Sequence, residues 1–298
     1  MIAVRLGTRG SQLALAQSGM VAGLLRRAHP GLNVEMVEIS TAGDRDQTSA
    51  LAEGVGWFTS AIQEALQRGE IDVAVHSYKD LPTARPEGLV IAAVPMREDA
   101  HDALVSGRGA GIAGLPPGAV LGTSSPRREA QLRALRPDLV FRPIRGNVDT
   151  RLAKVRSGEY DATVLAVAGL KRLGLDGAIS QVFEYHEMLP APAQGALAVE
   201  CREADAPTRS LLRAIDAPAL GQAVAAERAF LAKLGAGCTF PAAAHAEQAG
   251  NALELTALIA RDGQVVRSKV DGPASTAEEM GTMLAERLMA AVRMGAGN

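Results

Sequence analysis

Short apolar runs of strand length recur through the first two-thirds of the chain, and most are followed by apolar residues at helical spacing. This alternation is typical of α/β proteins with largely parallel sheets. A last part from about residue 222 predicts a small α+β domain with two strands and a final helix at 276–293. We predict strands at 3–7, 33–40, in the first half of 71–83, and at 89–94, 119–121, 139–144, 160–167 and 196–200. Predicted helices cover 12–28, 59–68, 126–135, a stretch following 145–151, and 222–234.

Basic and hydroxyl side chains directly follow several of these strands. Arg9 and Ser11 follow the first strand, and the segments 122–128, 145–151 and 168–172 follow three later ones. Ser11 can act as an ordinary helix cap, but Arg9 beside it has no capping role. Helix N-termini favour anions, and a doubly wound sheet brings such junctions to one edge. We therefore expect a site for a polyanion at that edge.

The segment 71–83 places Ser77, Lys79 and Asp80 at the end of a predicted buried strand. Taken alone, this segment favours an ordinary structural interpretation, in which Asp80 caps the following turn and Lys79 is solvated. The basic residues at the other strand ends shift the balance toward a ligand site, because ligands bind at the carboxyl ends of such strands. The stretch 41–58 is too long and polar for a tight connection, so we expect an active-site lid there.

Charge is distributed unevenly along the 298 residues. The net charge of −2 argues against non-specific nucleic-acid binding. Residues 123–172 nevertheless hold eleven basic and five acidic side chains, so this segment is +6 and the remainder −8. The sequence shows no apolar run of membrane-spanning length and no signal-peptide core, so we expect a cytoplasmic protein without a membrane partner. We also expect a monomer, because no apolar helix face stands out.

The two cysteines lie in different surroundings. Cys238 lies in a glycine-rich turn that suits core packing poorly, which favours a reactive thiol, whereas Cys201 follows an apolar strand and is expected to be structural. The five histidines show no metal-ligand spacing, so we expect no metal site.

Seven motifs together resemble the porphobilinogen deaminase family, also called hydroxymethylbilane synthases, nearly from end to end. No single motif identifies the family, but seven in the family's order make coincidence implausible. The motifs are TRGSQLALAQ (8–17), DVAVHSYKDLPT (72–83), GTSSPRR (122–128), IRGNVDTRL (144–152), LAVAGLKRLG (165–174), LPAPAQGA (189–196) and AERAFLAKLGAGC (226–238).

The resemblance implies an α/β fold with two periplasmic-binding-protein-like, doubly wound domains and a small C-terminal α+β domain. Domain 1 would comprise 1–96 and 193–216, domain 2 would comprise 97–192, and domain 3 would comprise 217–298. Such an enzyme joins four porphobilinogen molecules head to tail with loss of ammonia, and then releases the linear tetrapyrrole by hydrolysis. Its cofactor is a dipyrromethane primer made from the substrate, attached here through Cys238.

The resemblance also implies roles for individual residues. Each pyrrole ring carries an acetate and a propionate, which guanidinium groups hold by charge-assisted hydrogen bonds. Asp80 would be the catalytic residue, stabilising the cation formed on loss of ammonia and moving a proton. The implied dipyrromethane-binding residues are Cys238, Ser77, Lys79, Asp80, Thr123, Ser125, Arg127, Arg128 and Arg151. The implied substrate-binding residues are Arg9, Ser11, Gln17, Arg145, Gly146, Arg172 and Gln194.

The chain departs from the family pattern in the expected lid, where Val55 and Ser60 stand at positions that are lysine in many relatives. We expect hinge motion near 97–100 and 189–194. Two alternatives remain at this point. One is an anion-binding receptor of the same fold, against which the missing export signal and the Cys238 domain count. The other is a cysteine-nucleophile hydrolase, for which His245 is the histidine near in sequence.

Overall fold

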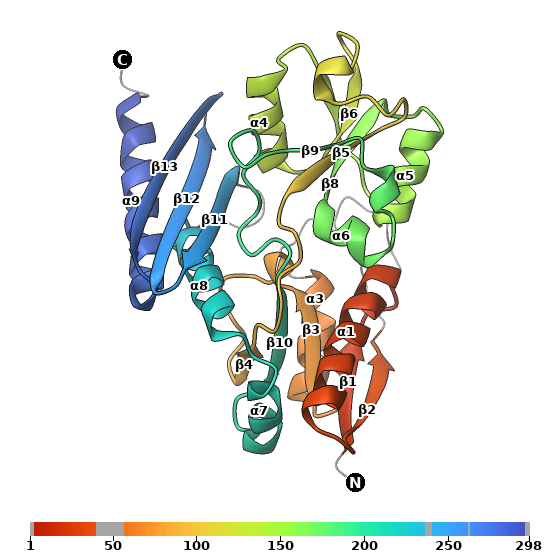
Figure 1. Cartoon of the computed structure of the whole chain (residues 1–298), viewed down its shortest axis with the longest axis vertical. Helices are drawn as coiled ribbons and strands as arrows, with labels where there is room; N and C mark the ends of the chain where they lie inside the picture. The colour runs from red at the N-terminus through yellow and green to blue at the C-terminus, as the bar shows by residue number, and fades with distance from the viewer. Residues whose placement is uncertain (1–2, 40–56, 236–239, 262, 296–298) are drawn as a thin grey trace. The chain divides into compact units, whose positions relative to one another are not determined.

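The computed structural model describes residues 3–39, 57–235, 240–261 and 263–295 (Figure 1). The chain forms two compact units. The first comprises Met1–Arg97 with Ala196–Gly221, and the second comprises Glu98–Gly195 with Gln222–Asn298. Within the described ranges, no helix is both long enough and apolar enough to cross a membrane.

A five-stranded mixed sheet forms the centre of the first unit. Its strand order is β2-β1-β3-β10-β4. Strand β1 runs parallel to β2 and β3, whereas β10 runs antiparallel to β3 and β4. The carboxyl ends of β1 and β3 therefore lie at the same edge. The strands are β1 (Ala3–Thr8), β2 (Asn33–Glu38), β3 (Val73–Ser77), β4 (Leu89–Ala93) and β10 (Leu197–Arg202).

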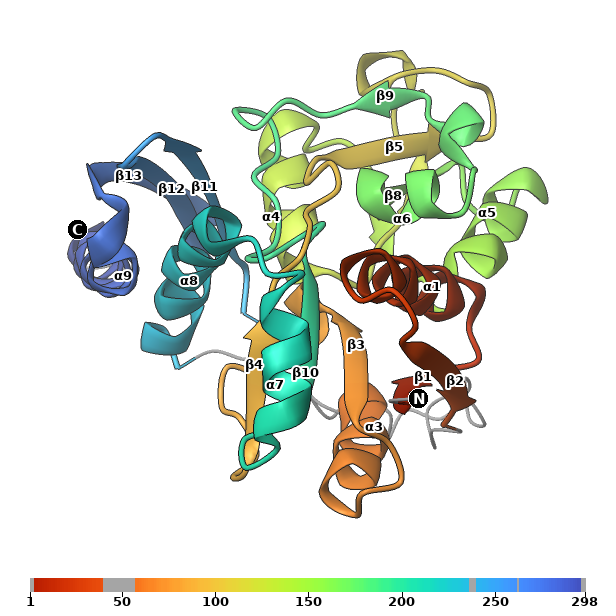
Figure 2. The same ribbon diagram turned by 60° about the horizontal axis from the view of Figure 1, so that its bottom comes forward.

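Helices cover both faces of this sheet. Helices α1 (Gln12–Ala28) and α7 (Ala206–Arg213) contribute apolar side chains to one cluster, and Figure 2 shows α7 against β10 and β4. Helix α3 (Trp57–Gln67) packs on the opposite face. Val73 and Ala74 are neighbours on β3 but belong to the two different clusters, because successive side chains of a strand point to opposite faces.

A second five-stranded mixed sheet lies in the second unit, in the order β7-β6-β8-β5-β9. Strand β6 runs parallel to β7 and β8, and β5 runs antiparallel to β8 and β9. The carboxyl ends of β7, β6 and β8 therefore meet at one edge. The strands are β5 (Asp102–Ser106), β6 (Val120–Gly122), β7 (Val140–Arg142), β8 (Ala162–Ala166) and β9 (Gln181–Val182).

The helices of this sheet also divide between its two faces. Leu132 of α4 (Pro126–Leu135) packs in one apolar cluster. Helices α5 (Val148–Arg156) and α6 (Val167–Arg172) contribute to another cluster, together with Ala103 and Val105 of β5.

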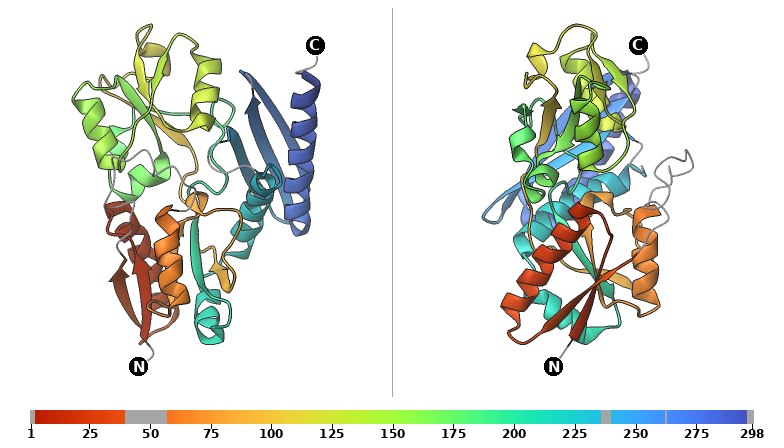
Figure 3. Two further views of the ribbon diagram at one scale, coloured as in Figure 1. Left: turned by 180° about the vertical axis from the view of Figure 1, so that it is seen from behind. Right: turned by 90° about the vertical axis from the view of Figure 1, so that its right-hand side faces the viewer.

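The C-terminal part of the second unit is an antiparallel sheet backed by helices. Strands β11 (Ala242–Ala249), β12 (Ala252–Arg261) and β13 (Gln264–Pro273) pair in sequence order. Helices α8 (Pro218–Lys233) and α9 (Ala277–Gly295) pack on its apolar face, and Figure 3 shows α9 lying along the strands. The prediction of two strands here was wrong, because the short connections leave the alternating pattern almost unbroken.

The predicted α/β fold class is confirmed: two mixed sheets, each with helices on both faces, and a small α+β part. The division into three domains at the predicted boundaries stays a prediction.

Candidate active site

The first unit brings several predicted site residues to one edge of its sheet. Ser11 caps α1, its hydroxyl accepting a hydrogen bond from Ala14 N at 3.3 Å. One and a half turns later, the buried Gln17 donates from Nε2 to Ser77 Oγ at 2.7 Å. The start of α1 and the end of β3 therefore meet, although the two residues are 60 positions apart. Arg9 is half-buried on the same side, directly after β1.

Asp80 lies at the end of a single 3-10 turn, Tyr78–Asp80, that follows β3. Tyr78 anchors this turn: its side chain is buried and its backbone N–H donates to Ala196 O at 3.0 Å. Lys79 is half-buried, whereas the Asp80 carboxylate is exposed. The turn thus holds a carboxylate in an accessible position at the carboxyl end of the sheet.

A buried polar cluster on the opposite face of β3 was missed from the sequence. His76 Nε2 lies 3.0 Å from Glu200 Oε2, and Gln63 Nε2 donates to both Glu200 oxygens at 3.1 Å. The available signal was a histidine inside an otherwise apolar run, which did not identify its partners.

The second unit brings together the three basic junctions predicted from the sequence. Thr123 and Ser125 follow β6, Arg145 follows β7, and Arg172 ends the helix that follows β8. Ser125 caps α4 by accepting from Arg128 N at 3.4 Å, and Thr123 Oγ1 accepts from Ser125 N at 3.2 Å. The expectation that these junctions share one sheet edge is confirmed for this unit.

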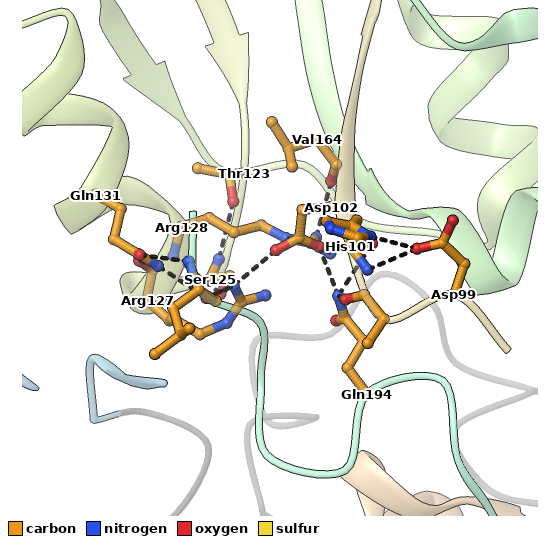
Figure 4. Close-up of polar contacts among 12 residues, drawn as sticks. Asp99, His101, Asp102, Thr123, Ser125, Arg127, Arg128, Gln131, Val164 and Gln194 are labelled. Carbon is orange, nitrogen blue, oxygen red and sulfur yellow. Dashed lines mark hydrogen bonds and ion pairs between the residues drawn. The ribbon is translucent and has the colours of Figure 1, made fainter. Parts of the chain in front are cut away.

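Two arginines at the start of α4 share one buried carboxylate (Figure 4). Arg127 Nη1 donates to Asp102 Oδ2 at 2.7 Å, and Arg128 Nη2 donates to Asp102 Oδ1 at 2.6 Å. Burial raises the pKa of Asp102, but the charges and hydrogen bonds of both arginines outweigh this and hold that pKa well below its ordinary range. Asp102 orients both guanidinium groups. It was missed from the sequence, for which no strand at 102–106 was predicted.

The guanidinium of Arg172 is only partly compensated by hydrogen bonds. Its Nη2 donates to Gly195 O at 2.6 Å, while its Nε is buried and has no hydrogen-bond partner among the described residues. Burial lowers the pKa of Arg172 to about 10, although Glu98 acts in the opposite direction. A half-buried guanidinium whose Nε donor is unused is suited to bind a carboxylate.

Three predicted residues follow β7: Arg145 and Gly146 lie in the loop, and Arg151 lies on α5. Gly146 has φ 104°, and a Cβ there would lie 2.7 Å from the Thr150 side chain, so the loop requires glycine. Its carbonyl accepts from Arg151 Nε at 2.8 Å, which fixes the half-buried Arg151 side chain. Arg145 is exposed beside it.

The crossover segment 189–195 lies against this cluster. Gln194 is fully buried and donates from Nε2 to Ala100 O at 2.7 Å and to Asp102 Oδ1 at 3.0 Å (Figure 4). Its amide donors therefore connect the crossover to the carboxylate that orients Arg127 and Arg128. The bond from Gln194 to Ala100 joins the two predicted hinge regions, 97–100 and 189–194. Beside it, Glu98 N donates to Gly195 O at 3.0 Å.

Two family models match the chain. The model of the porphobilinogen deaminase dipyrromethane cofactor binding domain matches residues 4–210, and that of the porphobilinogen deaminase C-terminal domain matches 222–290. The chain belongs to the porphobilinogen deaminase family. The resemblance stated from the seven motifs is thereby confirmed.

Curated porphobilinogen deaminases are similar over nearly their whole length. The protein of Roseiflexus sp. (strain RS-1) is 50% identical, with 95% of each chain covered. That of Mycolicibacterium paratuberculosis is 48% identical over 96% of this chain and 93% of its own. That of Geobacter sulfurreducens is 46% identical, covering 96% and 91%. Among solved structures, the methionine-binding protein MetQ matches 72% of this chain and 89% of its own at 13% identity, with a TM-score of 0.46.

The residues of the second unit fit the dipyrromethane of porphobilinogen deaminases. The spare Arg172 donor, the arginine pair on Asp102 and the hydroxyls at the start of α4 are donors suited to acetate and propionate groups. Cys238 and the expected lid at 41–58, except its last two residues, lie outside the described residues. His245, the histidine of the hydrolase alternative, lies 3.6 Å from Glu227 and from Glu247 and contacts the ring of Tyr185.

Proposed function

We propose that the protein is a hydroxymethylbilane synthase, which condenses four porphobilinogen molecules with loss of ammonia and then releases the linear tetrapyrrole by hydrolysis. Family membership supports this activity over the receptor and hydrolase alternatives. The structural observation that carries the proposal is Arg172, a half-buried cation whose buried Nε has no hydrogen-bond partner among the described residues, at the same sheet edge as the arginine pair on Asp102.

The primer would be a dipyrromethane attached to Cys238, and when bound it supplies the reactive pyrrole carbon that the first substrate extends. The residues proposed to hold its acetate and propionate groups are Ser77, Lys79, Thr123, Ser125, Arg127, Arg128 and Arg151. Asp102 supports this role by fixing the two adjacent guanidinium groups, so that their entropy is lost on folding rather than on binding.

The incoming porphobilinogen would be held by Arg9, Ser11, Gln17, Arg145, Gly146, Arg172 and Gln194. A substrate carboxylate would satisfy the buried Nε of Arg172, which supports this role. Gln17 acts through Ser77, to which its amide donates. Gln194 donates inward to Asp102, so its proposed contribution is to orient the arginine cluster.

Asp80 is the proposed catalytic residue. Loss of ammonia from porphobilinogen leaves an electron-poor, cationic pyrrole, which a nearby carboxylate stabilises through space. The new carbon–carbon bond leaves a proton on the attacked ring carbon, and the same carboxylate can accept it. The turn Tyr78–Asp80 suits this role, because Tyr78 is fixed by burial while the Asp80 carboxylate stays accessible.

The proposal extends to partners and location: porphobilinogen as the small-molecule substrate, no nucleic acid, and a monomer in the cytoplasm. Lengthening of the product would be accommodated by hinge motion at 97–100 and 189–194. Small-angle scattering of the holoenzyme and its loaded intermediates tests that motion, and identical curves would contradict it.

A stoichiometry measurement tests the activity. Purified holoenzyme incubated with porphobilinogen is expected to release one ammonia per substrate consumed and one linear tetrapyrrole per four. Saturable binding of porphobilinogen without ammonia release would support the receptor alternative instead.

A further inference from the structure

Ala193 has an unusual backbone conformation in the crossover. Its φ is 63°, and among the residues that the structure describes it is the one non-glycine residue with positive φ. It is fully buried, between Pro192 and Gln194. A side chain disfavours this left-handed conformation, so surrounding contacts must hold it in place.

A buried carboxylate contacts this backbone. Glu227 lies on α8 with no exposed surface, and its Oε2 accepts a hydrogen bond from Ala193 N at 2.6 Å. Its Oε1 accepts from Ala246 N on β11 at 2.8 Å. One carboxylate therefore ties the crossover to the C-terminal sheet, using both oxygens as acceptors of charge-assisted bonds.

The two residues after Ala193 contact the cations of this unit: Gln194 reaches the arginine pair on Asp102, and Gly195 reaches Arg172. Gln194 donates to Asp102, the partner of Arg127 and Arg128. Gly195 O accepts from Arg172 Nη2 at 2.6 Å. A rotation of Ala193 toward ordinary negative φ would redirect both of these contacts.

We infer that Glu227 is a positioning residue for the reaction: it holds Ala193 in the left-handed conformation and so aligns Gln194 with the Asp102–arginine cluster and Gly195 with Arg172. The kinetic consequences of this inference rest on the proposed function. Its structural part does not: this is the clamp, by which we mean the hydrogen bonds from Ala193 N and Ala246 N to the Glu227 carboxylate. A glutamine at 227 would place an NH2 group against one of two backbone donors, so only a carboxylate satisfies both.

Two substitutions separate positioning from simple support of the core. Glu227→Gln removes the second acceptor while keeping the size of the side chain. Ala193→Gly removes the cost of positive φ, so the crossover no longer needs the clamp. The matched control is Glu247→Gln, the same chemical change at an exposed acid that also lies 3.6 Å from His245 but makes no hydrogen bond to residues 189–195.

The first readout is amide hydrogen exchange of residues 193–195, which needs no substrate. Glu227→Gln is expected to speed it about tenfold or more, because a charge-assisted hydrogen bond to a buried amide is lost. Glu247→Gln is expected to leave it unchanged. Unchanged exchange in a folded Glu227→Gln protein would overturn the clamp, whatever the protein catalyses.

The second readout is steady-state kinetics with porphobilinogen. Glu227→Gln is expected to raise KM about tenfold with a smaller change in kcat, since substrate positioning is lost. Adding Ala193→Gly is expected to recover most of that loss, whereas Ala193→Gly alone stays near the parent enzyme. Absence of recovery in a folded double variant would assign Glu227 to core stability and overturn the positioning role. Inactivity of the parent enzyme would instead refute the proposed function, with the exchange result still deciding the clamp.

Discussion

Arg128 donates two hydrogen bonds to one carboxylate oxygen of Asp102 in the interior of the second unit, from Nε at 3.2 Å and from Nη2 at 2.6 Å. Arg127 occupies the other oxygen. One buried carboxylate therefore pairs with two buried guanidinium groups, so the three side chains together keep a net positive charge. That surplus of positive charge supports the proposal that this sheet edge binds carboxylates.

Removing this acid should destabilise the protein. Asp102→Asn leaves two buried guanidinium groups without their counter-charge, and we expect a loss of about 3 kcal/mol or more in the free energy of unfolding. Denaturant unfolding measures it. The control is Asp138→Asn, which removes an exposed partner of Arg136 and should cost about 1 kcal/mol or less. Equal effects of the two substitutions would show that the buried pair contributes no more than an exposed one.

The same pair sets an acid limit on stability. The pKa of Asp102 is lowered in the folded state, so its contribution is complete above its unfolded pKa of about 3.9 and is lost as the pH falls below that value. The parent protein should lose stability progressively from about pH 4 downward. Asp102→Asn should make the free energy of unfolding less dependent on pH below about pH 4. An unchanged slope would show that other carboxylates cause the loss of stability in acid.

Replacing Arg172 should weaken substrate binding without lowering the stability of the protein. Arg172→Met removes a half-buried cation whose desolvation is only partly compensated, so the apoprotein should be at least as stable as the parent. KM for porphobilinogen should rise about tenfold or more, because a charge-assisted bond to a substrate carboxylate is lost. Arg156→Met, at an exposed arginine, should change neither quantity. An unchanged KM in Arg172→Met would remove Arg172 from substrate binding.

Asp80 should be needed for turnover and not for folding. Its carboxylate is exposed, so Asp80→Asn should unfold at the parent temperature. Loss of charge stabilisation and proton transfer should lower kcat about a hundredfold or more. Single-turnover ammonia release checks this directly, and near-normal turnover would remove Asp80 from the mechanism.

Much of the fold could be predicted from local pattern alone. The helix at 12–28 was predicted with the bounds of α1, because Ser11 supplies its cap and the apolar spacing is regular. The basic strand ends were predicted because each junction is contiguous in sequence. The three-stranded C-terminal sheet was not, since its short connections interrupt the pattern too little.

The partners of the site residues could not be predicted, because they are distant in sequence. Asp102 meets Arg127 and Arg128 across 25 and 26 positions, and Glu227 meets Ala193 across 34. Neither Asp102 nor Glu227 belongs to a sequence motif from whose spacing its partner could be predicted. The unused donor of Arg172 also depends on tertiary burial, which no local pattern reports.

The most direct test of the account is intact-mass and peptide mass spectrometry of the purified, active protein. We predict a covalent adduct of two pyrrole rings on the peptide that contains Cys238, while the buried thiol of Cys201 stays unmodified. An unmodified Cys238 in protein that turns over porphobilinogen would contradict the account.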